Sequence, residues 1–100
     1  MSSGKAVIQI RVRGVSALRS IIGRDTVVTL KNGSTIRDLV TNLERNFGTT
    51  YKEVAGEELS GSIMRRFSML LNGVFMSPEQ NVDMKLNDGD EIVFFQLAGG

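Results

Sequence analysis

Residues 86–100 read LNDGDEIVFFQLAGG and combine a tight turn, a strand and a diglycine end. The sequence Asn-Asp-Gly-Asp is typical of a turn, and the apolar residues Leu86 and Ile92 flank it as anchors for a core. Residues 91–95 are predicted to form the last strand. Residues 96–100 are expected to be a flexible tail, because glycines lose much backbone entropy on ordering and offer no side chain for packing.

Two segments near the N-terminus predict a β-hairpin. Residues 6–13, AVIQIRVR, alternate between apolar and polar side chains, which is typical of a half-buried strand. Residues 26–30, TVVTL, are rich in β-branched side chains and predict the second strand. The connection over residues 15–23 is short and is expected to direct Leu18 into the core.

One helix is predicted to begin at Thr35, because an acid, Asp38, follows three residues later in a relative of the capping box. The apolar residues that recur at helical spacing on one face are Ile36, Leu39, Val40, Leu43 and Phe47. Gly48 is predicted to stop the helix. Residues 49–62 are expected to be a long surface segment with one turn of helix near residues 51–55.

The rest of the chain predicts a second hairpin. Residues 66–71 alternate as a third strand, and Asn72-Gly73 is a strong turn signal that leads into residues 74–76. Pro78 should end that strand or place it at a sheet edge, because proline donates no ladder hydrogen bond.

These elements together predict an α+β fold in which one main helix covers one face of a mixed sheet. The other sheet face is then open to solvent or to a partner. We expect one domain over residues 1–95, followed by the tail of residues 96–100.

Composition excludes many kinds of function. The chain has no histidine and no cysteine, which removes imidazole bases, thiolate nucleophiles and soft metal ligands. The acids at Glu57-Glu58 and at residues 88–91 are interpreted as surface and turn charge rather than as a catalytic or metal site. A net charge of +1 argues against nucleic acid as a partner, and no apolar run is long enough for a membrane span. The expected location is the cytoplasm.

The element order, the segment GSTIRDL at residues 33–39 and the stretch of residues 86–100 resemble the sulfur-carrier family of ubiquitin-like proteins, the MoaD/ThiS type. The similarity is greatest to the small subunit of molybdopterin synthase and covers nearly the whole chain, with residues 49–65 the least matched. That subunit usually carries prolines between the aromatic pair and the glycines, where this sequence has Gln96 and Leu97. The resemblance implies the β-grasp fold.

The resemblance also implies a mechanism with no catalytic side chain in the carrier itself. An activating enzyme of the ubiquitin-activating type would use ATP to adenylate the carboxylate of Gly100, which follows Gly99, and a persulfide sulfur would then replace AMP to leave a thiocarboxylate. No cofactor would stay bound. The sulfur would pass to the large subunit of molybdopterin synthase or to another acceptor.

The partner-binding residues are expected on the open sheet face and in the tail. Strand alternation places Phe95 on the open face if Ile92 and Phe94 are core, and the resemblance adds Phe75 and Val15. Leu97 and Ala98 of the tail complete the candidate set. A one-residue error in strand parity would instead make Phe75 and Phe95 ordinary core residues.

Two other functions remain open from the sequence. The chain could be a protein modifier that is joined to lysines through Gly100. It could also be a noncatalytic β-grasp binding module whose tail has no role.

Overall fold

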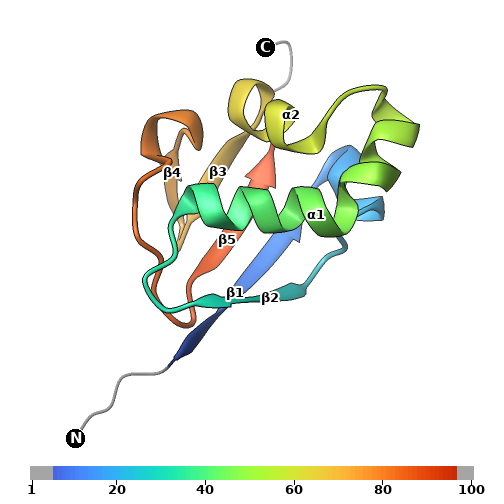
Figure 1. Cartoon of the computed structure of the whole chain (residues 1–100). Coiled ribbons are helices and arrows are strands. Elements are labelled where there is room, and N and C mark those ends of the chain that lie inside the picture. Colours follow the sequence, from blue (N-terminus) through green and yellow to red (C-terminus); the bar gives the residue numbers. More distant parts are fainter. Residues whose placement is uncertain (1–5, 97–100) are drawn as a thin grey trace, which may run out of the picture.

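Five strands form one mixed sheet in the order β2-β1-β5-β3-β4. The computed structural model describes residues 6–96, apart from the side chains of residues 16 and 17. The strands are β1 (Val7–Gly14), β2 (Thr26–Lys31), β3 (Ser68–Leu71), β4 (Val74–Met76) and β5 (Glu91–Phe95). The helices are α1 (Ile36–Ala55) and α2 (Leu59–Arg66), with 3-10 turns η1 (Ser16–Ser20) and η2 (Glu79–Asn81) in the connections. Both α-helices cover the same face of the sheet (Figure 1).

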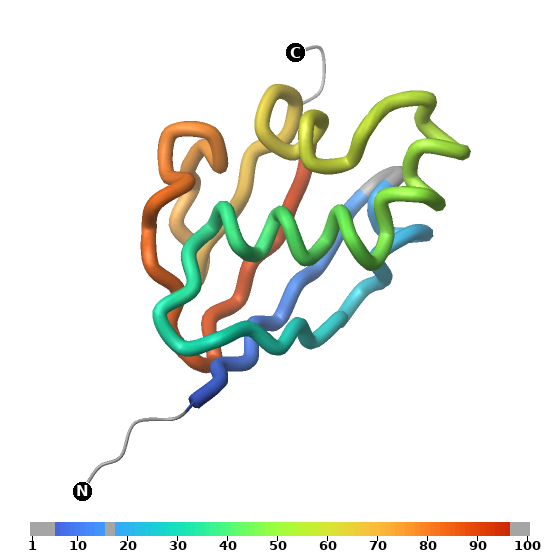
Figure 2. The backbone as a smooth tube through the Cα atoms, viewed as in Figure 1, coloured from blue at the N-terminus to red at the C-terminus, as the bar shows by residue number. Residues whose placement is uncertain are grey.

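The last strand lies in the middle of the sheet. β5 pairs in parallel with β1 and antiparallel with β3, so it runs between the two hairpins (Figure 2). β1 pairs antiparallel with β2, and β3 pairs antiparallel with β4. This is the β-grasp arrangement, and it confirms the predicted α+β fold.

Strand alternation assigns one face of the sheet to the core. The side chains of β1 are alternately exposed and buried along the whole strand, and those of β5 alternate in the same way between the core and the opposite face. Ile10, Val12, Ile92 and Phe94 have no exposed surface and pack under α1. The parity predicted for β1 and β5 is therefore confirmed, and within residues 6–96 no α-helix covers the opposite face of the sheet.

The predicted start of α1 is also confirmed. The hydroxyl of Thr35 accepts a hydrogen bond from the amide of Asp38, and the Asp38 carboxylate accepts one in return from the amide of Thr35 at 2.9 Å. This is a complete capping box. It satisfies amide groups that the first turn of a helix leaves without an intrahelical partner.

The predicted end of the helix is wrong. α1 continues through Gly48 to Ala55 and ends at Gly56, whose φ of 77° is the left-handed conformation that glycine adopts without strain. The helical turn predicted near residues 51–55 is present as the end of α1, which buries Tyr51. The rest of residues 49–62 is more regular than predicted, because residues 49–50 also belong to α1 and residues 59–62 form the first half of α2.

Contacts between the two helices explain why Gly48 does not end α1. The side chain of Glu44 lies over Gly48, where a Cβ atom would meet the Glu44 carboxylate. That carboxylate accepts a hydrogen bond from the amide of Ser60 at 2.8 Å, near the start of α2. A glycine costs a helix about 1 kcal/mol relative to alanine. Burial of Tyr51 and the link to Ser60 offset that cost.

The second hairpin follows the prediction with one shift. The third strand begins at Ser68 rather than at residue 66, because Arg66 is still the last residue of α2. Asn72 and Gly73 both have positive φ, 51° and 85°, as the tight turn requires. β4 is an edge strand and ends two residues before Pro78.

Candidate functional site

Four strands contribute side chains to one row across the open face of the sheet. Arg13 lies opposite Val93, Val93 opposite Leu70, and Leu70 opposite Phe75. Directly paired residues point to the same side of a sheet. Because their neighbours along β1 and β5 are buried under α1, these four point away from the helices.

Phe75, the last member of this row, contacts a second aromatic ring. The rings of Phe75 and Phe95 meet edge to face, with centroids 5.7 Å apart and an interplanar angle of 63°. Phe75 is 57% exposed, whereas Phe95 is half-buried. This edge-to-face geometry is favourable for aromatic rings. We call the apolar set Val15, Leu70, Phe75, Val93 and Phe95 the aromatic patch.

Val15 connects the aromatic patch to the end of β1. Its amide donates a hydrogen bond to the carbonyl of Phe94 at 3.3 Å, which continues the parallel pairing of β1 and β5 by one residue. Val15 therefore lies next to Phe95, where β5 ends. The half-buried side chain of Val15 extends the patch toward the edge of the sheet.

Charged residues border the aromatic patch on β1. Arg11 lies 3.4 Å from Glu91 and 3.8 Å from Asp25, and Arg13 lies 3.7 Å from the same Asp25 oxygen. All four side chains are about half exposed, so these pairs contribute little to folding stability. They give this part of the open face a polar rim.

The acids of the turn before β5 have structural roles. Asp88 accepts a hydrogen bond from the amide of Gln9 at 2.7 Å, which ties the turn to β1. Asp90 is 8% exposed and accepts from the amide of Asn87 and from the side-chain amide of Asn72, at 2.8 and 2.9 Å. These bonds fix the turn that leads into β5 against β1 and against the turn that follows β3.

Within residues 6–96, no group of three or more acidic, histidine or cysteine side chains comes together as a metal site. In the same part of the chain, neither α-helix combines the length and apolar character needed to cross a bilayer.

The structure brings three of the predicted site residues together. Phe95, Phe75 and Val15 all lie in the aromatic patch, so none of them belongs to the core under α1. Four further predicted residues, Leu97, Ala98, Gly99 and Gly100, lie outside the described residues.

Two members of the patch, Leu70 and Val93, were not among the predicted site residues, and both are half-buried. For Val93 the signal was the alternation of β5, which places it on the same face as Phe95. For Leu70 the signal was the register of the second hairpin. The Asn72-Gly73 turn places Leu70 opposite Phe75.

Solved structures with the same fold include proteins from Haloferax volcanii and Pyrococcus furiosus. The chain superimposes on the Haloferax volcanii HVO 2177 protein with a TM-score of 0.71 and 18% identity, over 100% of this chain and 93% of that one. For the putative molybdopterin converting factor subunit 1 of Pyrococcus furiosus the TM-score is 0.65 at 18% identity, over 89% and 97%. For SAMP1 of Haloferax volcanii it is 0.66 at 18% identity, over 92% and 98%. At these identities the similarity shows the fold alone.

Sequence comparison identifies the family. A search of curated protein sequences gave no significant match. The sequence does match the ThiS family over residues 15–100, which includes the second hairpin, the central strand β5 and the diglycine end. The match covers well over half of the chain, and the fold agrees with it. This protein therefore belongs to the ThiS family of ubiquitin-like sulfur carriers.

Proposed function

We propose that this protein carries sulfur as a thiocarboxylate on Gly100 and donates it in the biosynthesis of molybdopterin, the organic part of the molybdenum cofactor. The observation that carries the proposal is the family match, which extends through Gly99 and Gly100 to the last residue of the sequence. Family membership implies two kinds of partner, an activating enzyme and a sulfur acceptor. Both act in the cytoplasm in this proposal.

The chemistry needs an outside source of activation, because a free carboxylate is a poor electrophile. The Gly100 carboxylate attacks the α-phosphate of ATP, which gives an acyl-adenylate and pyrophosphate. The terminal sulfur of a persulfide then displaces AMP, and a thiol cleaves the resulting acyl disulfide to leave the thiocarboxylate. Each step uses groups supplied by partners, and the carrier provides the carbonyl carbon.

The position of β5 supports this role. The strand from which the tail continues is held on both sides, by β1 and by β3, and the amide of its first residue, Glu91, donates a hydrogen bond to the side chain of Asn72. A short tail that starts from a rigid strand can place its end only within a limited reach of that strand. Glycine suits that end, because a backbone without side chains can pass through a narrow channel to a nucleotide.

The aromatic patch is proposed as the surface that docks on these partners. Exposed aromatic residues grouped beside a polar rim are typical of interface anchors. The patch includes Phe95, the last residue of β5, and the tail begins at the next residue, Gln96. A partner that holds the tail therefore meets the patch at the same time.

Intact-mass spectrometry tests the proposal. The protein is incubated with ATP, a ubiquitin-activating-type enzyme of the same organism and a persulfide donor. We expect pyrophosphate release and the mass increase that corresponds to replacement of one oxygen by sulfur. A variant with one alanine added after Gly100 should show neither. If the unmodified chain forms no adenylate and gains no sulfur, the proposal is wrong.

A second candidate is a protein modifier joined to lysines through Gly100. Two of the structurally similar proteins are small archaeal modifier proteins, one from Haloferax volcanii and one from Methanosarcina acetivorans. Activation by adenylation would be common to both functions. A Gly-Gly remnant on lysines of other proteins after digestion would favour conjugation, and its absence in cells that make the thiocarboxylate would favour sulfur transfer.

A further inference from the structure

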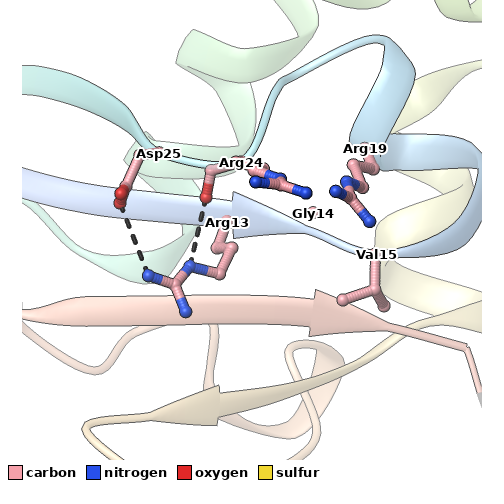
Figure 3. A pocket seen from close by; sticks show the side chains of 6 residues that line it. All are labelled: Arg13, Gly14, Val15, Arg19, Arg24 and Asp25. Atoms are coloured by element: carbon pink, nitrogen blue, oxygen red, sulfur yellow. Dashed lines mark hydrogen bonds and ion pairs between the residues drawn. The ribbon is translucent and has the colours of Figure 1, made fainter.

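A pocket of about 410 Å³ lies at the end of β1, between η1 and the segment that enters β2 (Figure 3). Three arginines and one carboxylate line it. The lining residues are Arg13, Gly14, Val15, Arg19, Arg24 and Asp25. The pocket is therefore rich in positive charge, although the whole chain has a net charge of only +1.

The single carboxylate of the pocket is already engaged. Asp25 lies 3.7 Å from Arg13 and 3.8 Å from Arg11, and Arg13 also donates a hydrogen bond to the carbonyl of Arg24 at 3.1 Å. Two guanidinium groups are left over. Among the described residues, no acid pairs with Arg19 or with the Arg24 side chain.

The two remaining guanidinium groups converge. Figure 3 shows Arg24 and Arg19 pointing toward each other above Gly14. Gly14 lines the pocket between them, and a Cβ atom at this position would collide with Leu18, so a residue larger than glycine would disturb this end of β1. Like charges that approach without a counter-ion repel each other, and an anion placed between them interacts favourably with both. Guanidinium groups are well suited to carboxylates, which they bind through paired hydrogen bonds.

The pocket lies at the end of the sheet where β5 finishes. Gly14, which lines the pocket, pairs with Phe94, and Val15 belongs both to the pocket and to the aromatic patch. Neighbouring strands are about 4.8 Å apart. The pocket is therefore beside the point from which the tail continues.

A partner that acts on Gly100 must cover this region. Five residues of chain lead from Phe95 to Gly100, which can span at most about 18 Å. A typical protein interface buries about 800 Å² on each partner, equivalent to a disc of about 16 Å radius. An enzyme whose active site holds Gly100 therefore has its surface within reach of Arg19 and Arg24.

We propose that Arg19 and Arg24 bind an acidic side chain of the enzyme that adenylates Gly100, as a charged site next to the aromatic patch. This inference rests on the proposed function. The contact would orient the carrier and speed its encounter with the enzyme, because complementary charge raises the association rate at low salt. Tail chemistry itself would be unaffected.

Steady-state kinetics of pyrophosphate release test the site. The double variant Arg19→Gln/Arg24→Gln is compared with Arg45→Gln/Arg65→Gln, which removes the same charge from exposed positions on α1 and α2. We expect Arg19→Gln/Arg24→Gln to raise the KM for the carrier about tenfold, because loss of one hydrogen bond between charged groups weakens binding by about that factor. Its kcat should be unchanged. Its KM should also depend less on salt than that of the unmodified protein. The control should behave as the unmodified protein does.

Each alternative result has a defined meaning. If the two double variants give the same KM and salt dependence, the site is refuted, whether both match the unmodified protein or both are impaired. A rise in the KM for ATP instead of the carrier would assign the pocket to nucleotide phosphate and would also refute it. In both cases the unmodified protein is still adenylated, so the proposed function stands. If the unmodified protein is never adenylated, the proposed function fails and this site fails with it.

Two checks keep the comparison valid. Circular dichroism and thermal unfolding establish that the variants fold, which we expect because both arginines are exposed. The variant Arg19→Lys/Arg24→Lys keeps the charge but loses the paired hydrogen bonds. It should recover the salt dependence and part of the affinity, and failure to recover either would contradict a site built on charge.

Discussion

The ring of Phe95 packs edge-on against the ring of Phe75, although their strands, β5 and β4, are separated in the sheet by β3. Phe95 lies opposite Ser68, whose small side chain leaves space above β3. The two rings therefore meet across the intervening strand. This contact concentrates aromatic surface at the end of the sheet from which the tail continues.

The first prediction concerns that contact. Phe95→Glu should leave the fold intact, because Phe95 lies outside the core, and should weaken binding to the activating enzyme by at least about 2 kcal/mol, as for an interface anchor. Calorimetric titration measures the affinity. Val54→Glu is the matched control, since Val54 is 66% exposed on α1. If the Phe95 variant unfolds, Phe95 contributes to the core. If its affinity for the activating enzyme is unchanged, Phe95 is not part of the docking surface.

The second prediction concerns the cap of α1. Thr35→Ala removes the hydroxyl that accepts from the amide of Asp38 and should lower the free energy of unfolding by about 1 kcal/mol. For a chain of this length the melting temperature should fall by about 5 °C. Thr41→Ala, at an exposed position of the same helix, should be neutral or slightly stabilising. An equal loss in both variants would show that the cap is not the cause.

The third prediction concerns the turn residue Asn72. Its side chain donates to Asp90 and accepts from the amide of Glu91, both at 2.9 Å, while its own φ is 51°. Asn72→Gly keeps the left-handed backbone accessible and should lower stability by about 2 kcal/mol through the two lost bonds. Asn72→Ala should cost about 1 kcal/mol more, because alanine is strained at positive φ.

Urea denaturation measures both Asn72 variants. Equal stabilities for the glycine and alanine variants would contradict the assigned backbone strain. A glycine variant as stable as the unmodified protein would show that the bonds to Asp90 and Glu91 add nothing to folding.

The fourth prediction runs against the usual sign of a core mutation. Ser62, in α2, is completely buried, and within the described structure its hydroxyl has no hydrogen-bond partner. Ser62→Ala removes an unsatisfied polar group at almost the same volume and should raise the free energy of unfolding by about 1 kcal/mol. Ser60→Ala in the same helix reports the change in helix propensity alone. A destabilised Ser62 variant would show that the hydroxyl has a partner, such as a bound water.

Local signals were sufficient for the parts of this fold in which each strand or turn carries its own pattern. Alternation in β1 and β5 predicted which side chains face α1, and the Asn72-Gly73 turn predicted the second hairpin. These features depend on steric preferences of a few consecutive residues, so a sequence can specify them directly.

The C-terminal half of α1 could not be predicted in this way. Gly48 is a reasonable stop signal within its own segment, and only the packing of Tyr51 and the bond from Ser60 to Glu44 carry the helix past it. The length of α1 is thus set by α2, whose first residue is Leu59. Interactions between segments distant along the chain outweighed a local preference of about 1 kcal/mol.

The candidate site, like the fold, depends partly on the sequence alone and partly on the tertiary structure. The sequence by itself determined the family, the absence of histidine and cysteine, and the aromatic residue Phe95 that alternates onto the open face. Only the tertiary structure decided that Phe75 reaches Phe95 across β3 and that Arg19 and Arg24 converge over Gly14. The physical reason is that alternation sets the side of the sheet on which a residue lies, whereas its neighbours on that side are set by strand order and register.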